Sequence, residues 1–314
     1  MADKKIIAVV GATGAQGGGL VRAILEDGSN EFAARAITRN AKSDKARALA
    51  DQGVEVVEAN IDDIDSITRA FTGAYGAFCV TFFWEHFSAE RETNEAHNLA
   101  EAAKKADVQH VIWSTLEDTR ESVPLSDDRM PTLNGKYKVP HLDSKGEADH
   151  FFTDLGVPTT FLLTSFYWDN LIHFGMGPRR GEDGTLTFVL PMGEKRLAGI
   201  AAEDIGRAAL GIFKAGPSTI GQRIGIAGEH LTGSQMVETL SKQMGEPVAY
   251  YAMPPEDYRR LGFPGAEDLG NMFQFFRDFE ESFVERRSVE RTRQLNPRLQ
   301  TFREFVQKNE IPIS

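Results

Sequence analysis

A glycine-rich run near the N-terminus has the residue types and spacing of a phosphate-binding turn. The run, Gly11–Gly17, follows the apolar stretch Ile6–Val10 and leads into Gly18–Leu25, which has helical character. In a Gly-x-x-Gly-x-x-Gly turn, the glycines allow a tight turn, close approach of phosphates and close packing of helix on strand. The helix start then attracts the pyrophosphate. This order of strand, turn and helix favours a dinucleotide site over a plain turn without a ligand. The predicted pyrophosphate-binding residues are Gly11, Thr13, Gly14, Ala15, Gln16 and Gly17.

An arginine at the end of the second apolar stretch indicates which dinucleotide is bound. Sheets that bind NAD place Asp or Glu here, on the ribose 2′-hydroxyl. This chain has Arg39, with Lys42 and Lys45 nearby. A guanidinium can bind a 2′-phosphate through charge-assisted hydrogen bonds, whereas a carboxylate would repel it. We therefore predict NADP(H) rather than NAD(H), the alternative being that Arg39 is a solvated surface charge.

Two further positions each allow two interpretations. Asp62, at the end of the third apolar stretch, is either a helix N-cap or a neighbour of the adenine edge. The aromatic segment Thr164–Asn170 follows the sixth stretch, at the sheet edge where such folds bind ligands. Its aromatic side chains either wall the nicotinamide or form core between two domains.

His141 and Lys145 are the candidate catalytic residues. Their i, i+4 spacing places both on one face of a predicted helix, His141–Leu155. The pair resembles the Tyr-x-x-x-Lys pair of short-chain dehydrogenases, in which the lysine binds the nicotinamide ribose and lowers the pKa of the tyrosine. A histidine can also donate a proton. The missing phenol nevertheless favours reading His141 as a buried polar residue near the helix start, while Lys145 is read as a ribose contact rather than a solvated charge. Ser114 and Thr115 could supply a hydroxyl beside them.

Apolar and helical stretches alternate through the first half of the chain. The apolar stretches are Ile6–Val10, Phe32–Thr38, Val54–Glu58, Gly76–Thr81, His110–Ser114 and Thr159–Leu163. The helical stretches are Gly17–Asp27, Ser43–Asp51, Ile64–Phe71, Ser88–Ala106 and His141–Leu155. Strands that are joined by helices run parallel with right-handed crossovers, so the pattern predicts a doubly wound α/β sheet.

The second half departs from this alternation. We expect a hairpin at Thr185–Leu190, and a helix at Ala202–Lys214 and a strand at Gln222–Ala227 that join the main sheet. Residues 229–314 are helix-rich. The predicted division is residues 1–164 plus 197–228 for the nucleotide domain, and 165–196 plus 229–314 for a smaller substrate or partner domain.

Composition narrows the classes of partner. The 314 residues include 46 acidic and 35 basic side chains, a formal charge of −11, which disfavours direct nucleic-acid binding. The single cysteine, Cys79, excludes an internal disulfide and fits a reducing compartment. The N-terminus lacks signal-peptide features, and no stretch approaches the roughly 18 apolar residues of a membrane span. We expect a cytoplasmic protein, with the nucleus as a second location, no metal and no membrane contact.

The sequence resembles the NmrA-like family, an atypical branch of the short-chain dehydrogenases, and within it the members that sense NADP(H). The stretches that carry the resemblance are Gly11–Gly17, Ala36–Asn40, Val80–Glu85, His141–Glu147, Trp168–Leu171, Met253–Asp257 and Leu261–Asn271. They cover nearly the whole chain. Those around His141 and Leu261 are specific, because ordinary Rossmann proteins lack them.

The resemblance implies a Rossmann domain with a smaller C-terminal α/β domain. It implies that the Gly11 turn holds the pyrophosphate, Arg39 the 2′-phosphate and Lys145 the nicotinamide ribose. We add four residues to the predicted cofactor site, namely Thr81, Phe166, Tyr167 and Asn170. Family members divide into redox sensors that act through regulatory proteins and reductases of quinones and similar acceptors. We predict a redox-sensing regulator, a homodimer being a further expectation. The alternative is an NADPH-dependent reductase, and whether the chain is an enzyme stays open.

Overall fold

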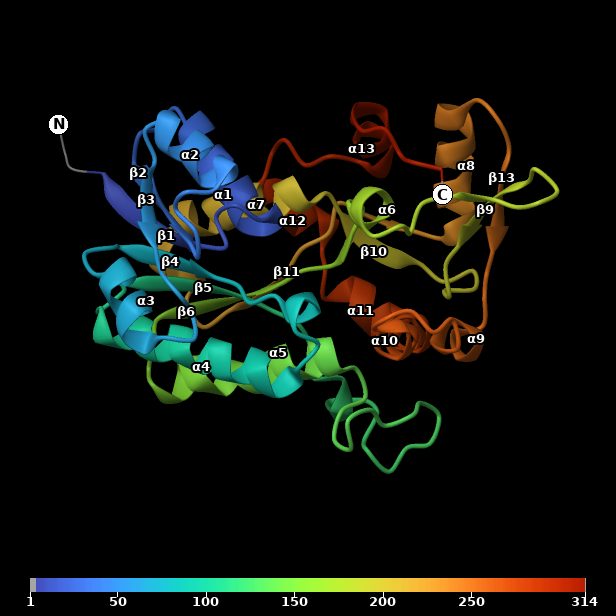
Figure 1. Cartoon of the computed structure of the whole chain (residues 1–314), viewed down its shortest axis with the longest axis horizontal. Helices are drawn as coiled ribbons and strands as arrows, with labels where there is room; N and C mark the ends of the chain where they lie inside the picture. Colours follow the sequence, from blue (N-terminus) through green and yellow to red (C-terminus); the bar gives the residue numbers. More distant parts are fainter. Residues whose placement is uncertain (1–3, 314) are drawn as a thin grey trace.

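The protein is described by a computed structural model in which residues 4–313 are placed. Its centre is a parallel sheet of seven strands in the order β11-β6-β5-β4-β1-β2-β3 (Figure 1). The strands are β1 (Lys5–Val10), β2 (Phe32–Thr38), β3 (Glu55–Glu58), β4 (Gly76–Cys79), β5 (His110–Thr115), β6 (Thr159–Leu163) and β11 (Arg223–Gly225). The predicted doubly wound α/β sheet is confirmed, including its late seventh strand.

Helices cover both faces of this sheet (Figure 1). One face carries α1 (Ala15–Glu26), α2 (Asp44–Asp51), α7 (Ala202–Ala215) and α12 (Val289–Leu295), and the other carries α3 (Ile64–Phe71), α4 (Ala89–Lys105) and α5 (Pro140–Asp154). Successive side chains of a strand point to opposite faces. Accordingly Ile7 and Val9 of β1 pack with α1 and α7, whereas Ala8 and Val10 pack with α3 and α4. Both faces are apolar, which explains why the strands read as continuous apolar stretches.

Helix α7 packs closely on both α1 and α12. A Cβ on Gly206 would lie 2.1 Å from the backbone nitrogen of Leu20, and a Cβ on Gly211 would lie 2.2 Å from the carbonyl oxygen of Leu295. Only glycine permits such approaches. The predicted helix at Ala202–Lys214 therefore belongs to the layer that covers the main sheet, although it follows residues of the second part of the chain.

The C-terminal part contains two three-stranded sheets surrounded by helices (Figure 1). The sheets are β12 (Glu229–Leu231), β10 (Leu197–Ile200) and β7 (Phe166–Tyr167), and β13 (Val248–Tyr251), β9 (Leu186–Val189) and β8 (Arg179–Arg180). The helices are α6 (Asn170–His173), α8 (Gly233–Met244), α9 (Pro255–Arg259), α10 (Ala266–Asp278), α11 (Glu280–Glu285) and α13 (Phe302–Lys308). The predicted hairpin range, Thr185–Leu190, contains only the strand β9, which pairs antiparallel with β8 before it. The chain also has 3-10 turns η1 (Phe83–Glu85), η2 (Thr119–Glu121) and η3 (Gly216–Thr219).

A buried ion pair links this part to the main sheet. The fully buried Arg287 donates to Glu117 Oε2 at 2.8 Å and to the carbonyl oxygen of Thr164 at 2.7 Å. Glu117 follows β5 and Thr164 follows β6. The proposed domain boundaries stay a prediction; β10, which they assign to the nucleotide domain, hydrogen-bonds with β7 and β12 of the smaller sheet.

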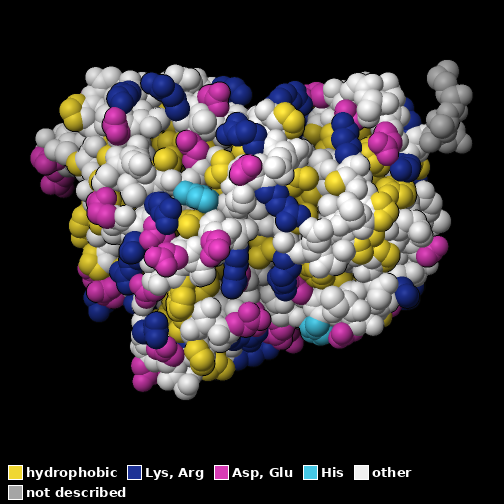
Figure 2. All heavy atoms as spheres, turned by 180° about the vertical axis from the view of Figure 1, so that it is seen from behind, with side chains coloured by type: hydrophobic (Ala, Val, Ile, Leu, Met, Phe, Trp, Pro, Cys, Tyr) yellow, Lys and Arg dark blue, Asp and Glu magenta, His cyan; other side chains and the backbone are white. Residues whose placement is uncertain are grey.

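The surface carries mixed charge. On the face opposite to that of Figure 1, acidic and basic side chains are interspersed (Figure 2). Within residues 4–313, no helix has both the length and the apolar character needed to cross a membrane.

Candidate functional site

The glycine turn has the geometry of a phosphate cradle. Gly11 has φ +65°, which disfavours other residues, and a Cβ on Gly17 would lie 2.5 Å from the carbonyl oxygen of Gly11. Helix α1 begins directly after Gly14, and within the described chain no side chain caps its N-terminus. An uncapped helix start has free N–H groups that suit an anion. The turn therefore fits the pyrophosphate predicted for it.

Gln16 connects this turn to the ends of two other elements. Ser114 Oγ at the end of β5 donates to Gln16 Oε1 at 2.8 Å, and Gln16 Nε2 donates to the Tyr167 hydroxyl at 2.6 Å. Burial raises the pKa of Tyr167 to about 12, so its phenol stays neutral. Gln16 and Tyr167 were both predicted as cofactor residues, and the structure brings them together. Their contact had no signal in the sequence, because the two residues are 151 positions apart.

Two rings of the aromatic segment after β6 belong to the core, as one of its two interpretations predicted. Phe166 is buried against Phe273 at a ring distance of 6.1 Å, and Trp168 is buried against Phe302 at 5.4 Å. These two rings form core, whereas Tyr167 between them reaches the glycine turn. Asn170, also predicted for the cofactor, is the first residue of α6.

Arg39 is exposed and forms an ion pair. Its guanidinium donates to the carboxylate of Glu85, the last residue of η1, and the two side chains are 60% and 41% exposed. The hydrogen bond from Arg39 is the main cause that holds the pKa of Glu85 below its usual range. Lys42 and Lys45 are exposed on the surface nearby in sequence. The basic residues were found from the sequence, but the acidic partner was missed.

The helix-cap interpretation of Asp62 is wrong. The N-cap of α3 is Asp63, whose carboxylate accepts hydrogen bonds from the backbone of Asp65 and Ser66. Asp62 instead accepts a hydrogen bond of 3.1 Å from Arg91 on α4. A carboxylate one residue earlier in the chain lies outside the helix and is free to reach across to its neighbour.

Lys145 lies in a polar cluster under the sheet edge. Its ammonium donates to Thr81 Oγ1 at 2.7 Å and pairs with Glu92 Oε1 on α4 at 2.6 Å. Lys145 is only 11% exposed and Glu92 is fully buried, so the solvated-charge interpretation of Lys145 is wrong. Burial would raise the pKa of Glu92, but the charge of Lys145, the nearby His86 and the hydrogen bond from Thr81 lower it to about 2. Lys145 and Thr81, both predicted for the cofactor, are thus adjacent, and Glu92 was missed.

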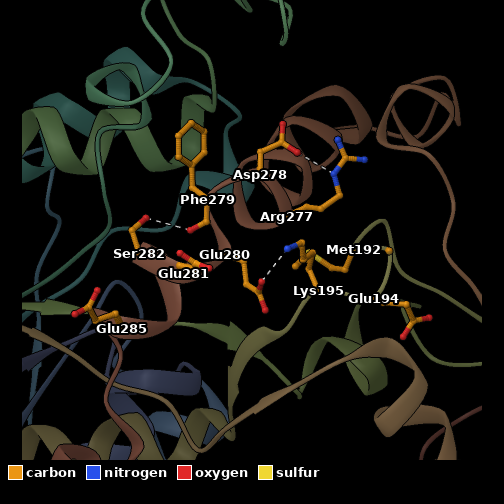
Figure 3. A pocket seen from close by; sticks show the side chains of 11 residues that line it. Met192, Glu194, Lys195, Arg277, Asp278, Phe279, Glu280, Glu281, Ser282 and Glu285 are labelled. Carbon is orange, nitrogen blue, oxygen red and sulfur yellow. Dashed lines mark hydrogen bonds and ion pairs between the residues drawn. The ribbon is translucent and has the colours of Figure 1, made fainter.

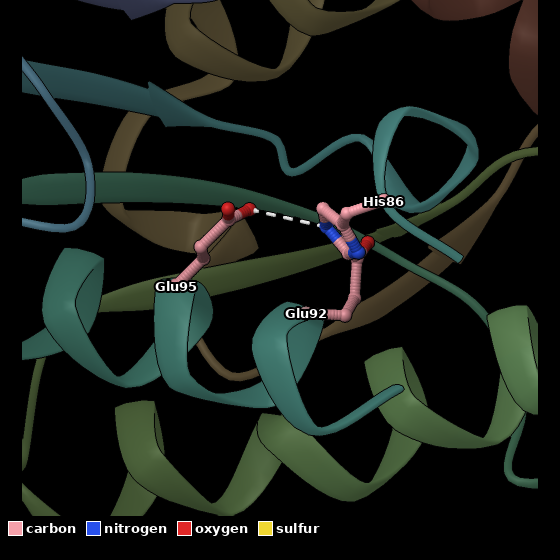
Figure 4. A group of neighbouring side chains, drawn as sticks. All are labelled: His86, Glu92 and Glu95. Atoms are coloured by element: carbon pink, nitrogen blue, oxygen red, sulfur yellow. Dashed lines mark ion pairs between the residues drawn. The ribbon is translucent and has the colours of Figure 1, made fainter. Parts of the chain in front are cut away.

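Glu92 belongs to a group of three titratable side chains that Figure 4 shows together. His86 Nε2 lies 3.4 Å from Glu92 Oε2 and 3.8 Å from Glu95 Oε2. Each carboxylate also faces a base, Lys145 or Arg91. The charges therefore nearly balance already, and a proton on His86 suits the group better than a divalent ion. The contact with Glu92 is the main cause that raises the pKa of His86.

His141 is held by an aspartate from the C-terminal part. Its Nδ1 lies 2.6 Å from Asp268 Oδ1, and its backbone N–H donates to Asp268 Oδ2 at 3.2 Å. Both side chains are buried, and the Trp84 ring lies 4.7 Å from the imidazole. His141 is a buried polar residue near a helix start, as the sequence favoured. An imidazole oriented by a carboxylate is also the arrangement that proton-transferring histidines use.

The surface of residues 4–313 includes the following two hollows. One of about 700 Å³ adjoins the histidine–aspartate contact, and its lining includes Asp268, Phe83, Phe87 and Phe263. The other, of about 1010 Å³, lies between the segment Met192–Lys195 and the region where α10 meets α11 (Figure 3). No residue predicted for the cofactor lines this second hollow, and several of its charged side chains pair with each other, such as Lys195 with Glu280 at 3.2 Å.

The site agrees with the family resemblance, because it has an intact glycine turn, a lysine at the sheet edge and a histidine in the tyrosine position. Comparison with family models establishes the family. The model of the NmrA-like family matches residues 3–306. The chain belongs to the NmrA-like family. This NmrA-like protein is 28% identical over 294 residues to the NmrA-like family domain-containing oxidoreductase lnbB of Aspergillus flavus, covering 87% of this chain and 84% of that one. It is also 28% identical to the oxidoreductase FrzB of Cladobotryum sp., covering 86% and 83%.

Among solved structures, this NmrA-like protein is similar to NmrA, a negative transcriptional regulator. The two are 25% identical with a TM-score of 0.79, over 98% of this chain and 95% of NmrA. NmrA has been solved in complex with NAD and in complex with NADP. The cofactor predicted from Arg39 is thus one that NmrA binds.

Proposed function

We propose that this NmrA-like protein binds NADP(H) and acts as a redox-responsive regulator through protein partners. The residues fit the dinucleotide, since the Gly11–Gly17 turn is a cradle that a Cβ at Gly17 would fill. Arg39 would hold the 2′-phosphate, and Lys145 with Thr81 would hold the nicotinamide ribose. The NADP complex of the regulator NmrA supports this reading.

The observation that carries the proposal is a short segment, residues 81–87, which contacts both the nucleotide residues and the C-terminal part. Thr81 hydrogen-bonds with Lys145, and Glu85 with Arg39. Between them Trp84 packs on His141, and a Cβ on Gly265 would lie 2.8 Å from its ring. A change of conformation at Thr81 or Glu85 would therefore alter the packing of Trp84 against the loop before α10.

Exposed apolar side chains flank this contact on both sides. They are Phe82, Phe87, Leu261 and Phe263, each between 39% and 52% exposed. Apolar side chains that gather at a surface are typical of protein-binding sites. A nucleotide can regulate such a surface only by binding two of its states with different affinity.

Hydrogen exchange tests the proposal. We expect NADP⁺ to change amide exchange both in residues 82–87 and in residues 261–268. In Trp84→Ala the second change should be lost while NADP⁺ still binds, and in the control Phe82→Ala both changes should remain. A response to NADP⁺ confined to the glycine turn would contradict the proposal.

The second candidate function is an NADPH-dependent reductase of quinones or similar flat acceptors, and the His141–Asp268 contact favours it. NADPH, when bound, supplies a hydride. Reduction of a quinone to a hydroquinone needs a hydride and a proton, and His141, oriented by Asp268 beside the 700 Å³ hollow, is the proposed source of the proton. The aromatic rings of the 700 Å³ hollow suit a flat acceptor, and the curated relatives named above are called oxidoreductases.

NADPH consumption distinguishes the two candidates. Absorbance is followed at high protein concentration with a panel of quinones, aldehydes and dyes. Protein-dependent turnover with any acceptor establishes the reductase. Absence of turnover, in a sample that binds NADPH, rejects the reductase for that panel and leaves the regulator.

A further inference from the structure

The acidic partner of Arg39 competes with the nucleotide that Arg39 is proposed to bind. Glu85 accepts a hydrogen bond from the Arg39 guanidinium, the group that would hold the 2′-phosphate. Carboxylate and phosphate are both oxygen anions that a guanidinium binds through its N–H groups. Two such anions repel one another at the same guanidinium, so a 2′-phosphate competes with Glu85 for Arg39.

The surroundings of Arg39 increase this competition. The hydrogen bond with Glu85 is the main cause that raises the pKa of Arg39, and the charges of Glu85, Glu95 and Asp62 add to it. Glu85 is the carboxylate in direct contact with Arg39, whereas Asp62 and Glu95 are paired with Arg91. A nucleotide without the 2′-phosphate does not compete with Glu85, so Arg39 keeps its hydrogen bond to Glu85 when such a nucleotide binds.

We infer that Glu85 is a specificity-determining residue, an internal substitute for the 2′-phosphate that narrows the preference of this site for NADP(H) over NAD(H). The inference rests on the proposed function, in which Arg39 holds the 2′-phosphate. Glu85 stands next to Trp84, which packs on His141 and the loop at Gly265. Displacement of Glu85 therefore makes the response of the C-terminal loop depend on the phosphate, rather than on any dinucleotide.

The test is a set of dissociation constants for NADP⁺ and NAD⁺, measured by calorimetry on the full chain. The variants are Glu85→Gln, Arg39→Met and the double variant. Glu85→Gln should strengthen NADP⁺ binding about two- to fivefold, the range expected for a largely exposed ion pair, and leave NAD⁺ binding unchanged. In the Arg39→Met background, Glu85→Gln should have no effect on NADP⁺.

Glu31→Gln is the matched control for the loss of one negative charge. Glu31 is 42% exposed and paired with Lys5, but it precedes β2 whereas Arg39 follows it, so it lies at the opposite edge of the sheet. Equal strengthening of NADP⁺ and NAD⁺, or none with Glu85→Gln, would overturn the inference. If Arg39→Met leaves NADP⁺ affinity intact, the assignment of the 2′-phosphate site itself fails, which is a separate result.

Discussion

His141 Nδ1 lies 2.6 Å from Asp268 Oδ1, although the two residues are 127 positions apart in the chain. The contact joins α5 under the main sheet to α10 of the C-terminal part. Asp268 fixes the orientation of the imidazole, so that Nδ1 faces the carboxylate and Nε2 is the nitrogen left to act on a ligand. The missing tyrosine of the Tyr-x-x-x-Lys pattern is therefore replaced by an oriented imidazole rather than by an isolated one.

If the chain reduces acceptors, both members of this pair are needed for turnover. His141→Phe should lower kcat at least about 100-fold, the contribution of a general acid, and Asp268→Asn should lower kcat while leaving NADPH affinity unchanged. Steady-state kinetics and NADPH titration separate the two effects. Asp257→Asn, which changes an exposed aspartate of α9, is the control. Unchanged kcat in Asp268→Asn would show that Asp268 has no positioning role.

Gly17→Ala should abolish nucleotide binding. The added Cβ would lie 2.5 Å from the carbonyl oxygen of Gly11 and 2.8 Å from that of Val10, so the turn must open. Gly28→Ala is the matched control, because among residues 4–313 no heavy atom lies within 4 Å of a Cβ there. Calorimetric titration with NADPH measures both. Retained affinity in Gly17→Ala would place the pyrophosphate elsewhere.

Lys145 and Glu92 should depend on each other for stability. Lys145→Met leaves the fully buried Glu92 without its base and should cost about 3–5 kcal/mol in the free energy of unfolding. The double variant with Glu92→Gln should recover a large part of that loss but not NADPH binding. Urea unfolding of the two single variants, the double variant and the parent protein gives the interaction energy of the pair. Lys242→Met, which breaks the exposed pair with Glu238, should cost no more than about 1 kcal/mol. Additive losses at Lys145 and Glu92 would mean that the two do not interact.

His110 should make the protein sensitive to mild acid. Burial lowers the pKa of His110 from 6.5 to about 4, so the unfolded chain binds the proton first as the pH falls. Stability is therefore lost between pH 6.5 and pH 4, by up to about 3 kcal/mol. Asp149 acts in the opposite sense, because burial raises its pKa to about 6 and its contribution to stability is lost as the pH rises from 3.8 to 6.

The comparison is between His110→Gln and the parent protein, by urea unfolding at several pH values. His110→Gln should be less stable at neutral pH, since the hydrogen bond between His110 and Thr160 changes, but should lose less stability on acidification. His150→Gln, at an exposed position of α5, is the control, and its free energy of unfolding should depend on pH as that of the parent protein does. If the free energy of unfolding of His110→Gln falls with decreasing pH as steeply as that of the parent protein, other groups cause the acid sensitivity.

The fold could be predicted from the sequence because both faces of the sheet are covered. Each strand is then a continuous apolar stretch, and β2 and β6 were predicted to the residue. Strand β10 was not foreseen as a partner of β7 and β12, because short strands in small sheets carry no periodic signal of their own.

The candidate site could be predicted only where its residues are local in sequence. The glycine turn, and Lys145 four residues after His141, form recognisable patterns. Their partners Glu85, Glu92 and Asp268 come from other elements, and separations such as 127 residues leave no pattern to read. Long-range pairing of charges is decided by tertiary packing, so it emerges only with the structure.

The contact of Gly206 with the start of α1 has a consequence for synthesis of the chain. When residues 1–164 have left the ribosome, the apolar side of α1 with Leu20 and Ile24 still lacks α7, and the sheet still lacks β11. The nascent nucleotide-binding layer therefore stays open until roughly sixty further residues have emerged, including segments that belong to neither α7 nor β11. We therefore expect the first-made half to close its apolar layer only after α7 and β11 have been synthesised.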